Sequence, residues 1–222
     1  GIEINSGNAN AIQLVARVCR QMEKLLGSRL VSIAGGTKHN AIPRSAVAVL
    51  TVEDPAGAKA LCSIIEQDLL EEFAGIESAV SIKGEEVAVD KCLTEDFSSR
   101  AICLLMALPH GVRKMSGVVE GLVETSCNLA IVDWKNEELE VLLSVRSAVN
   151  PAKDAFCESI AAIGSLAGAS VSMGNGYPGW APDNSSKLLK TARTVFAERF
   201  GSEPVVEAIH AGLECGIIGE RV

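Results

Sequence analysis

The most constraining feature of the sequence is a pair of long strand-forming runs joined by a short polar turn. Residues 122–134 and 139–147 are rich in apolar and β-branched side chains, and Lys135-Asn136-Glu137 connects them. Such a short connection predicts an antiparallel hairpin, because parallel strands need a much longer crossover. The fold must therefore contain an antiparallel sheet, and other elements must cover its apolar surface.

Helical periodicity supplies those covering elements. Apolar residues recur at three- and four-residue spacing in four segments, which is typical of amphipathic helices. Asp54, Thr94 and Asn150 can cap the starts of three segments, and Gly27 and Gly168 provide stops for two. The expected helices are residues 10–26, 54–73, 94–108 and 150–167.

Shorter strand-like runs complete the pattern, at residues 30–34, 46–53, 79–82, 87–90 and 169–173. Residues 1–90 and 91–173 then each consist of helices packed on one face of antiparallel strands. We expect an α+β fold with two halves that are similar in element type, although no sequence repeat relates them.

A different pattern follows. Residues 174–184 are dense in Gly, Pro and Asn, which predicts a loop or an interdomain crossover. A helix at 185–200 and a strand at 205–209 come next, as in an α/β fold. We place a domain boundary near residues 177–180, giving domains 1–178 and 179–222. The second is too short to be stable alone and is interpreted as part of a larger domain.

Composition narrows the class of partner. The net charge is −8 and aromatic residues make up 4% of the 222, a poor match for nucleic acid or an anionic membrane. The sequence has no apolar run as long as a membrane helix and no signal-peptide pattern. The seven cysteines have no metal-knuckle spacing, which is typical of buried thiols in a reducing compartment. A cytoplasmic location is expected.

The candidate chemical groups are few. His39, His110 and His210 are scattered, so the sequence offers no complete metal site and no catalytic residue. Arg146 ends a strand that otherwise reads as buried, so it needs an acidic partner: an internal carboxylate and a bound ligand are equally good interpretations. Asn40 could hold a peptide-like group, although ordinary turn chemistry is the favoured explanation on local evidence.

Three stretches together resemble one family. They are residues 35–44 (GGTKHNAIPR), residues 121–129 (GLVETSCNL), and residues 177–180 (YPGW) followed by 209–216 (IHAGLECG). In order and spacing they are similar to the aminoacyl-histidine dipeptidases (Xaa-His dipeptidase, PepD type), within the clan of di-zinc exopeptidases.

The resemblance implies a catalytic α/β domain with two zinc ions, interrupted by an α+β lid domain that holds the substrate and takes part in a homodimer. It matches Asn40 and Arg146 to lid residues that contact the substrate. The lid holds the C-terminal carboxylate of the substrate, for which a bidentate Arg is suited, and stabilises the oxyanion. It also places His210, Gly212 and Glu214 in a loop lining the substrate site.

Departures from the family pattern set the final hypothesis. The family's metal ligands have no counterpart here, a lid histidine would fall just before Gly1, and a Pro-Asn-Gly-Val loop reads PHGV at 109–112. We therefore expect a lid domain (1–178) with part of a catalytic domain (179–222), inactive alone. In the full-length protein it would serve a zinc-dependent dipeptidase acting on Xaa-His (carnosine-like) dipeptides. The alternative is a non-catalytic α+β dimerisation or ligand-binding module.

Overall fold

The computed structural model describes residues 2–135, 137–174, 176, 179, 183 and 185–206. These residues form one short 3₁₀ helix, five strands and five α-helices. They are η1 (Ile2–Asn5), α1 (Ala11–Leu26), β1 (Leu30–Gly35), β2 (Ala46–Leu50), α2 (Pro55–Glu72), α3 (Glu95–Ala107), β3 (Gly111–Met115), β4 (Val123–Lys135), β5 (Glu138–Ser147), α4 (Asn150–Leu166) and α5 (Lys187–Phe200).

One antiparallel sheet organises these elements, and β4 is its central strand. β5 runs along one edge of β4 for its whole length, from the pair Thr125–Ser147 to the pair Lys135–Glu138. Two strands share the other edge: β3 pairs with the first part of β4, and β1 reaches its far part at Gly35. β2 pairs with β1 on the outside. The strands β1, β3 and β5 therefore pair directly with β4, and β2 joins the sheet through β1.

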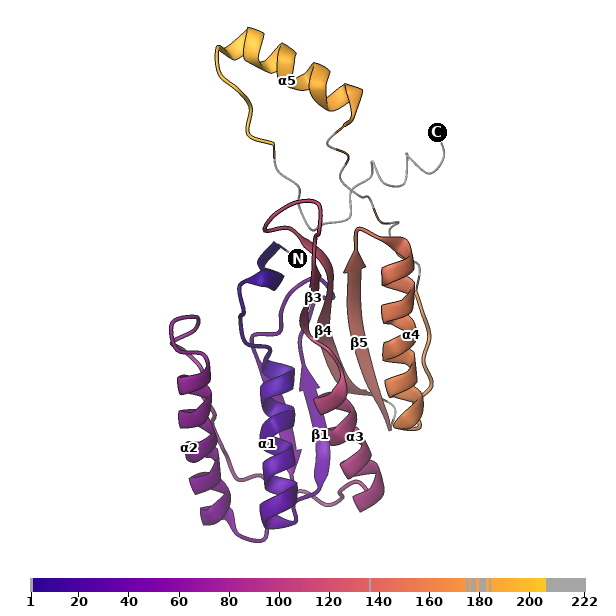
Figure 1. Cartoon of the computed structure of the whole chain (residues 1–222). Coiled ribbons are helices and arrows are strands. Elements are labelled where there is room, and N and C mark those ends of the chain that lie inside the picture. Colours follow the sequence, from indigo (N-terminus) through magenta and orange to yellow (C-terminus); the bar gives the residue numbers. More distant parts are fainter. Residues whose placement is uncertain are drawn as a thin grey trace.

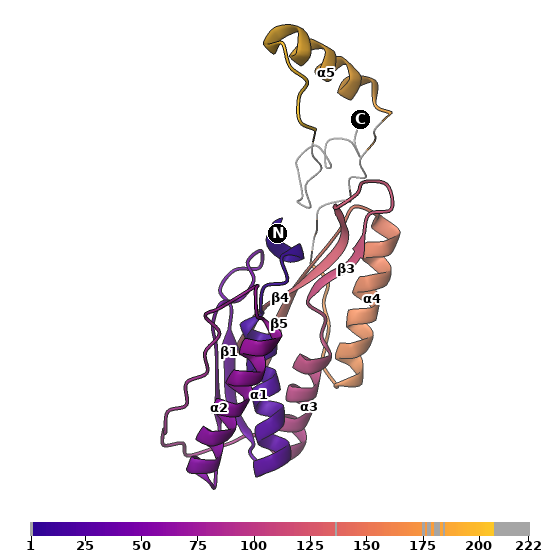
Figure 2. The same cartoon turned by 60° about the vertical axis from the view of Figure 1, so that its left-hand side comes forward.

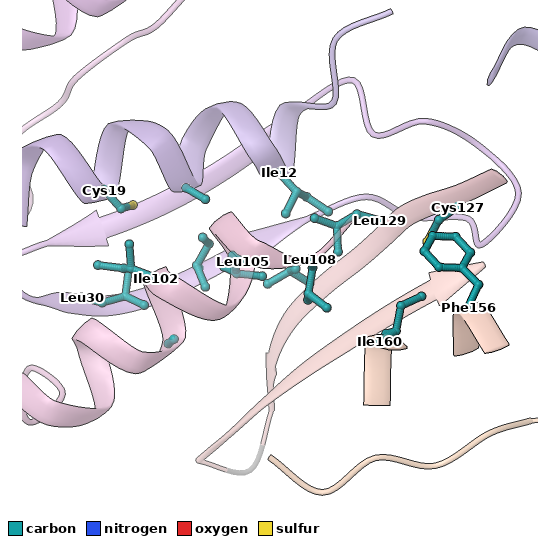
Figure 3. Close-up of a cluster of buried hydrophobic side chains, with 14 residues drawn as sticks. Ile12, Cys19, Leu30, Ile102, Leu105, Leu108, Cys127, Leu129, Phe156 and Ile160 are labelled. Carbon is teal, nitrogen blue, oxygen red and sulfur yellow. The ribbon is translucent and has the colours of Figure 1, made fainter. Parts of the chain in front are cut away.

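The helices α1, α3 and α4 cover one face of this sheet (Figures 1 and 2). A single apolar core fills the space between them, because all three helices turn their apolar stripes inward. Figure 3 shows Ile12 of α1, Ile102 of α3 and Phe156 of α4 in the cluster that also contains Leu30 and Leu129 of the sheet. This core fixes the positions of the strands that carry the polar residues described below.

The start of α1 is tied directly to β4 by Asn10. Its side-chain Oδ1 accepts hydrogen bonds from the backbone N–H groups of Ile12 and Gln13, which is N-capping. Its Nδ2 donates to the carbonyl of Leu129 at 2.8 Å. α2 lies beside α1, on the side away from α3 (Figure 1), and packs on it through Val18 and other apolar residues.

The α+β class, the antiparallel sheet and the expected helices are confirmed. The division into two similar halves is different: one continuous sheet serves both halves. The sequence also missed β3, whose residues (GVRKM) carry no clear alternation of apolar and polar side chains.

Three expected short strands are wrong, and packing on helices explains them. Residues 79–82 and 87–90 form no strand. Val80 and Ile82 instead pack on the apolar cluster beside α2, and the N–H of Ile82 donates to Glu66 of that helix. Residues 169–173 form no strand either, because Ala169 and Val171 lie against Gly164 of α4.

Beyond α4, the expected helix at 185–200 is present as α5, capped by Ser186 and ended by Gly201 in the left-handed conformation. In both views α5 lies apart from the sheet (Figures 1 and 2). Val205 and Val206 are not in a strand, and the rest of the expected strand at 205–209 lies outside the described residues. The boundary at 178/179 stays a prediction. None of the helices in the described part of the chain is both long and apolar enough to cross a lipid bilayer.

Candidate functional site

Two polar side chains of β4, those of Ser126 and Asn128, lie on the sheet face that the helices do not cover. Cys127 and Leu129 belong to the helix-side core, so the alternation of a strand turns Ser126 and Asn128 to the opposite face. These two polar residues are nevertheless buried. The connection between β1 and β2, residues 36–45, must therefore cover them.

The path of that connection begins at Gly36. Its φ is +74°, and a Cβ built on it would lie 1.9 Å from the carbonyl oxygen of Ala130 in β4. The 36–45 loop thus crosses the backbone of β4 at a distance that only glycine permits. Its far end is fixed where the carbonyl of Pro43 accepts a hydrogen bond of 3.0 Å from the N–H of Ala11.

Asn128 fastens the middle of the 36–45 loop. Its Nδ2 donates to the carbonyl of Ala41 at 2.7 Å and to the carbonyl of His39 at 3.3 Å. Asn40 is the residue between these two acceptors. The side chain of Asn128 is therefore bonded to the loop backbone on both sides of Asn40.

Arg146 reaches the same place from β5. In the β4–β5 pairing it stands opposite Ser126, and Ser144 stands opposite Asn128, so these four residues share a sheet face. Together they line a small open hollow, here called the Arg146 hollow. Its full lining is Ile4, His39, Asn40, Ile42, Ser126, Asn128, Ser144 and Arg146.

The structure thus brings together Asn40 and Arg146, which are 106 positions apart in the chain. The described residues that line it supply one guanidinium group, one imidazole, and carboxamide and hydroxyl groups. A guanidinium can bind a carboxylate with two parallel hydrogen bonds, and a carboxamide N–H can donate to a carbonyl oxygen. The hollow has the chemistry to bind the carboxyl end of a peptide. The roles of Asn40 and Arg146 in substrate binding stay predictions.

Sequence reasoning missed Asn128, Ser126 and Ser144 as members of this site. A signal was present: Asn128 interrupts the otherwise apolar stretch 127–132 of β4, and Thr125 and Ser126 come just before it. A buried carboxamide needs hydrogen-bond partners, which makes such a residue a candidate for holding another segment. The sequence alone could not show which segment.

His110 belongs to another cavity. That cavity of about 480 Å³ lies between η1 and the helices α1, α2 and α3, and Asn10 and Arg17 also line it. The Nδ1 of His110 is 3.1 Å from the Nδ2 of Asn10, and burial lowers its pKa from 6.5 to about 4. His110 is therefore neutral near pH 7. It is not among the residues that line the Arg146 hollow.

His210, Gly212 and Glu214, the other expected contributors, lie outside the described residues. Within the described part of the chain, no three His, Cys, Asp or Glu side chains come together in a way that could hold a metal ion. The described residues thus do not fit the zinc ions that the resemblance implies.

Comparison with known proteins places these features in a family. No family model matches the chain. The chain is 35% identical over 220 residues to the cytosol non-specific dipeptidase of Escherichia coli (strain K12), covering 98% of this chain and 45% of that protein. Its fold matches the crystal structure of the aminoacylhistidine dipeptidase from Vibrio alginolyticus with a TM-score of 0.93 and 33% identity, over 99% of this chain and 46% of that one.

The match extends along nearly the whole chain, while the chain spans about half the length of the relatives it matches. Both relatives are dipeptidases by name, which agrees with the motifs at residues 35–44 and 121–129. The resemblance read from the sequence is confirmed: over nearly its whole length the chain matches part of PepD-type dipeptidases, of which it spans about half the length.

Proposed function

We propose that the full-length protein is a dipeptidase and that this chain supplies the groups that hold the substrate. The observation that carries the proposal is the meeting of Asn40 and Arg146 in one hollow, although they come from a loop and a strand far apart in the sequence. The family match supports it, because both relatives are named as dipeptidases.

In this proposal Arg146 binds the C-terminal carboxylate of the dipeptide. Its place on β5 favours that task, because β5 is paired with β4 along its whole length and so gives the side chain a rigid base. A fixed guanidinium selects for substrates that end one residue after the scissile bond, since a longer peptide would place its carboxylate elsewhere.

Asn40 has the second task. Its carboxamide N–H donates to the peptide group next to the bound carboxylate, where negative charge develops on the carbonyl oxygen during hydrolysis. The 36–45 loop brings Asn40 to the rim of the Arg146 hollow. The two residues together orient the dipeptide rather than carry out proton transfer.

We propose Xaa-His (carnosine-like) dipeptides as the preferred substrates. The name of the Vibrio alginolyticus relative supports that preference, while the name of the Escherichia coli relative indicates a broader range of dipeptides. A series of dipeptides with the same first residue and different second residues measures how strong the preference is.

The two zinc ions remain part of this proposal on the strength of the resemblance alone. The described residues form no cluster for them, so their ligands must come from other residues, and no step is derived through them here. Zinc analysis of the purified full-length protein tests this part separately.

A cytoplasmic location and a homodimer complete the proposal. The word "cytosol" in the name of the Escherichia coli relative supports the first. The edge strand β2 supports the second, because Val47 is 65% exposed there and exposed strand edges pair readily between subunits. Light scattering of the wild type and of a Val47→Lys variant, which places a charge on that edge, tests the dimer.

The experiment for the central function is steady-state kinetics of the full-length protein on Xaa-His dipeptides. Arg146→Ala should lower kcat/KM by a factor equivalent to about 2–4 kcal/mol of transition-state stabilisation, because it removes a charge-assisted contact to the substrate. Arg100→Ala is the matched control, since Arg100 pairs with Asp96 on the surface of α3. Wild-type kinetics in Arg146→Ala contradict the proposal, and a full-length protein that hydrolyses no dipeptide supports the non-catalytic module instead.

A further inference from the structure

The buried carboxamide of Asn128 in the Arg146 hollow uses its N–H donors, but its carbonyl oxygen accepts no hydrogen bond from the described residues. Asn128 is 8% exposed, and its Nδ2 donates to two backbone carbonyls of the 36–45 loop. Its Oδ1 is buried and has no hydrogen-bond partner among the described residues. An unpaired buried carbonyl costs free energy, so this arrangement needs a compensating gain.

The compensating gain comes from the two hydrogen bonds that the N–H donors of Asn128 make. A carboxamide offers two N–H donors from one short side chain, whereas a serine has one and an aspartate or leucine has none. The two acceptors are the carbonyls of His39 and Ala41, on either side of Asn40. The side chain at position 128 thus holds the loop backbone at the point where Asn40 projects.

Asn128 is well placed to do this because β4 cannot shift easily. β4 is paired on both edges and packs on the helix-side core through Cys127 and Leu129. Two further anchors of the loop lie near its ends, at Gly36 and Pro43. The bonds from Asn128 therefore attach the middle of the loop to the sheet.

We propose that Asn128 is a positioning residue of the substrate site: it acts through the backbone of His39 and Ala41 to fix Asn40 at the Arg146 hollow. This inference rests on the proposed function for its catalytic consequence. Its structural part, the attachment of the loop by Asn128, stands on the described contacts.

The first experiment needs no catalysis. Hydrogen exchange of the amides of residues 38–42 is compared between the wild type and Asn128→Asp, which keeps the size of the side chain and removes both donors. Exchange should become about tenfold faster, as expected for the loss of local hydrogen bonds. If Asn128→Asp does not fold, Asn128→Ser takes its place, because it carries no charge and retains one donor.

Asn10→Asp is the matched control. Asn10 is also a buried asparagine, and its Nδ2 donates to the carbonyl of Leu129 on the same strand. The aspartate keeps the capping oxygen of α1 and loses the donor. It should leave exchange in residues 38–42 unchanged. Equal exchange in Asn128→Asp and the wild type overturns the inference.

The second experiment is a double-mutant cycle in the full-length enzyme with Asn40→Ala and Asn128→Ala. If Asn128 acts through Asn40, Asn128→Ala alone should lower kcat/KM by about 10- to 100-fold, as a misplaced contact group does. In the Asn40→Ala background it should have less than a twofold effect. Losses that multiply in the double variant would mean that Asn128 acts independently of Asn40, and they would overturn the inference.

The two proposals fail in different ways. A full-length protein without dipeptidase activity refutes the proposed function, while the exchange experiment still decides whether Asn128 fastens the loop. The positioning role alone is refuted by a different result. Arg146→Ala and Asn40→Ala then lower kcat/KM as expected, but the losses from Asn128→Ala and Asn40→Ala multiply in the double variant.

Discussion

Replacing Gly36 by alanine tests how the 36–45 loop is built. The structure gives two separate reasons for a large effect. A backbone φ of +74° is rare for residues other than glycine. The new Cβ would also lie 1.9 Å from the carbonyl oxygen of Ala130. That neighbour is the backbone of the central strand, which is not free to move aside.

The expected magnitude follows from these two terms. The left-handed conformation costs about 1–2 kcal/mol for an alanine. Relief of the clash adds about 1–3 kcal/mol, the usual range for overpacking. Gly36→Ala should therefore lower the free energy of unfolding by about 2–5 kcal/mol.

Gly121→Ala is the control that separates the two terms. Its φ is also +74°, and a Cβ there meets nothing within 4 Å, so it should cost only about 1–2 kcal/mol. Urea unfolding followed by circular dichroism measures both variants of the 222-residue chain. Equal losses of stability in the two variants would refute the close crossing of the loop over β4.

Three further predictions concern the helix side of the sheet. Burial lowers the pKa of His110 from 6.5 to about 4. Between these pH values the unfolded chain binds a proton that the folded chain does not. The free energy of unfolding should therefore fall by at most about 3 kcal/mol as the pH drops from 6.5 to 4. The variant His110→Gln should lose this part of the pH dependence in urea unfolding at a series of pH values. Cys103 is exposed whereas burial raises the pKa of Cys127 to about 12, so mass spectrometry after brief alkylation at pH 8 should find Cys103 labelled and Cys127 unlabelled. Ser98→Ala should lower the free energy of unfolding by about 1–3 kcal/mol, because the buried N–H of Leu30 then loses its 2.8 Å bond to the Ser98 hydroxyl; an unchanged unfolding midpoint contradicts this.

The sequence carries the parts of this fold that depend on local pattern. The long runs at 122–134 and 139–147 predicted β4 and β5, and the caps at Asp54 and Thr94 predicted the starts of α2 and α3 within a residue. Amphipathic periodicity was sufficient there because each helix turns one apolar stripe to the core.

The parts that failed depend on contacts between distant segments. Residues 79–82 have the composition of a strand, but their apolar side chains pack beside α2, which no local pattern distinguishes from strand pairing. The same reason applies to the candidate site. Arg146 and Asn40 could be named from the motifs, but the role of Asn128 required the knowledge that the 36–45 loop crosses β4 above it.

The most direct test of the central claim compares a dipeptide with its C-terminal amide in the full-length protein. If Arg146 binds the substrate carboxylate, the wild type should prefer the free acid in kcat/KM by about 30-fold or more, equivalent to about 2 kcal/mol or more. In Arg146→Ala that ratio should fall close to one, because the group that distinguishes carboxylate from amide is gone. A ratio that is the same in the wild type and in Arg146→Ala would contradict the claim that this residue holds the substrate.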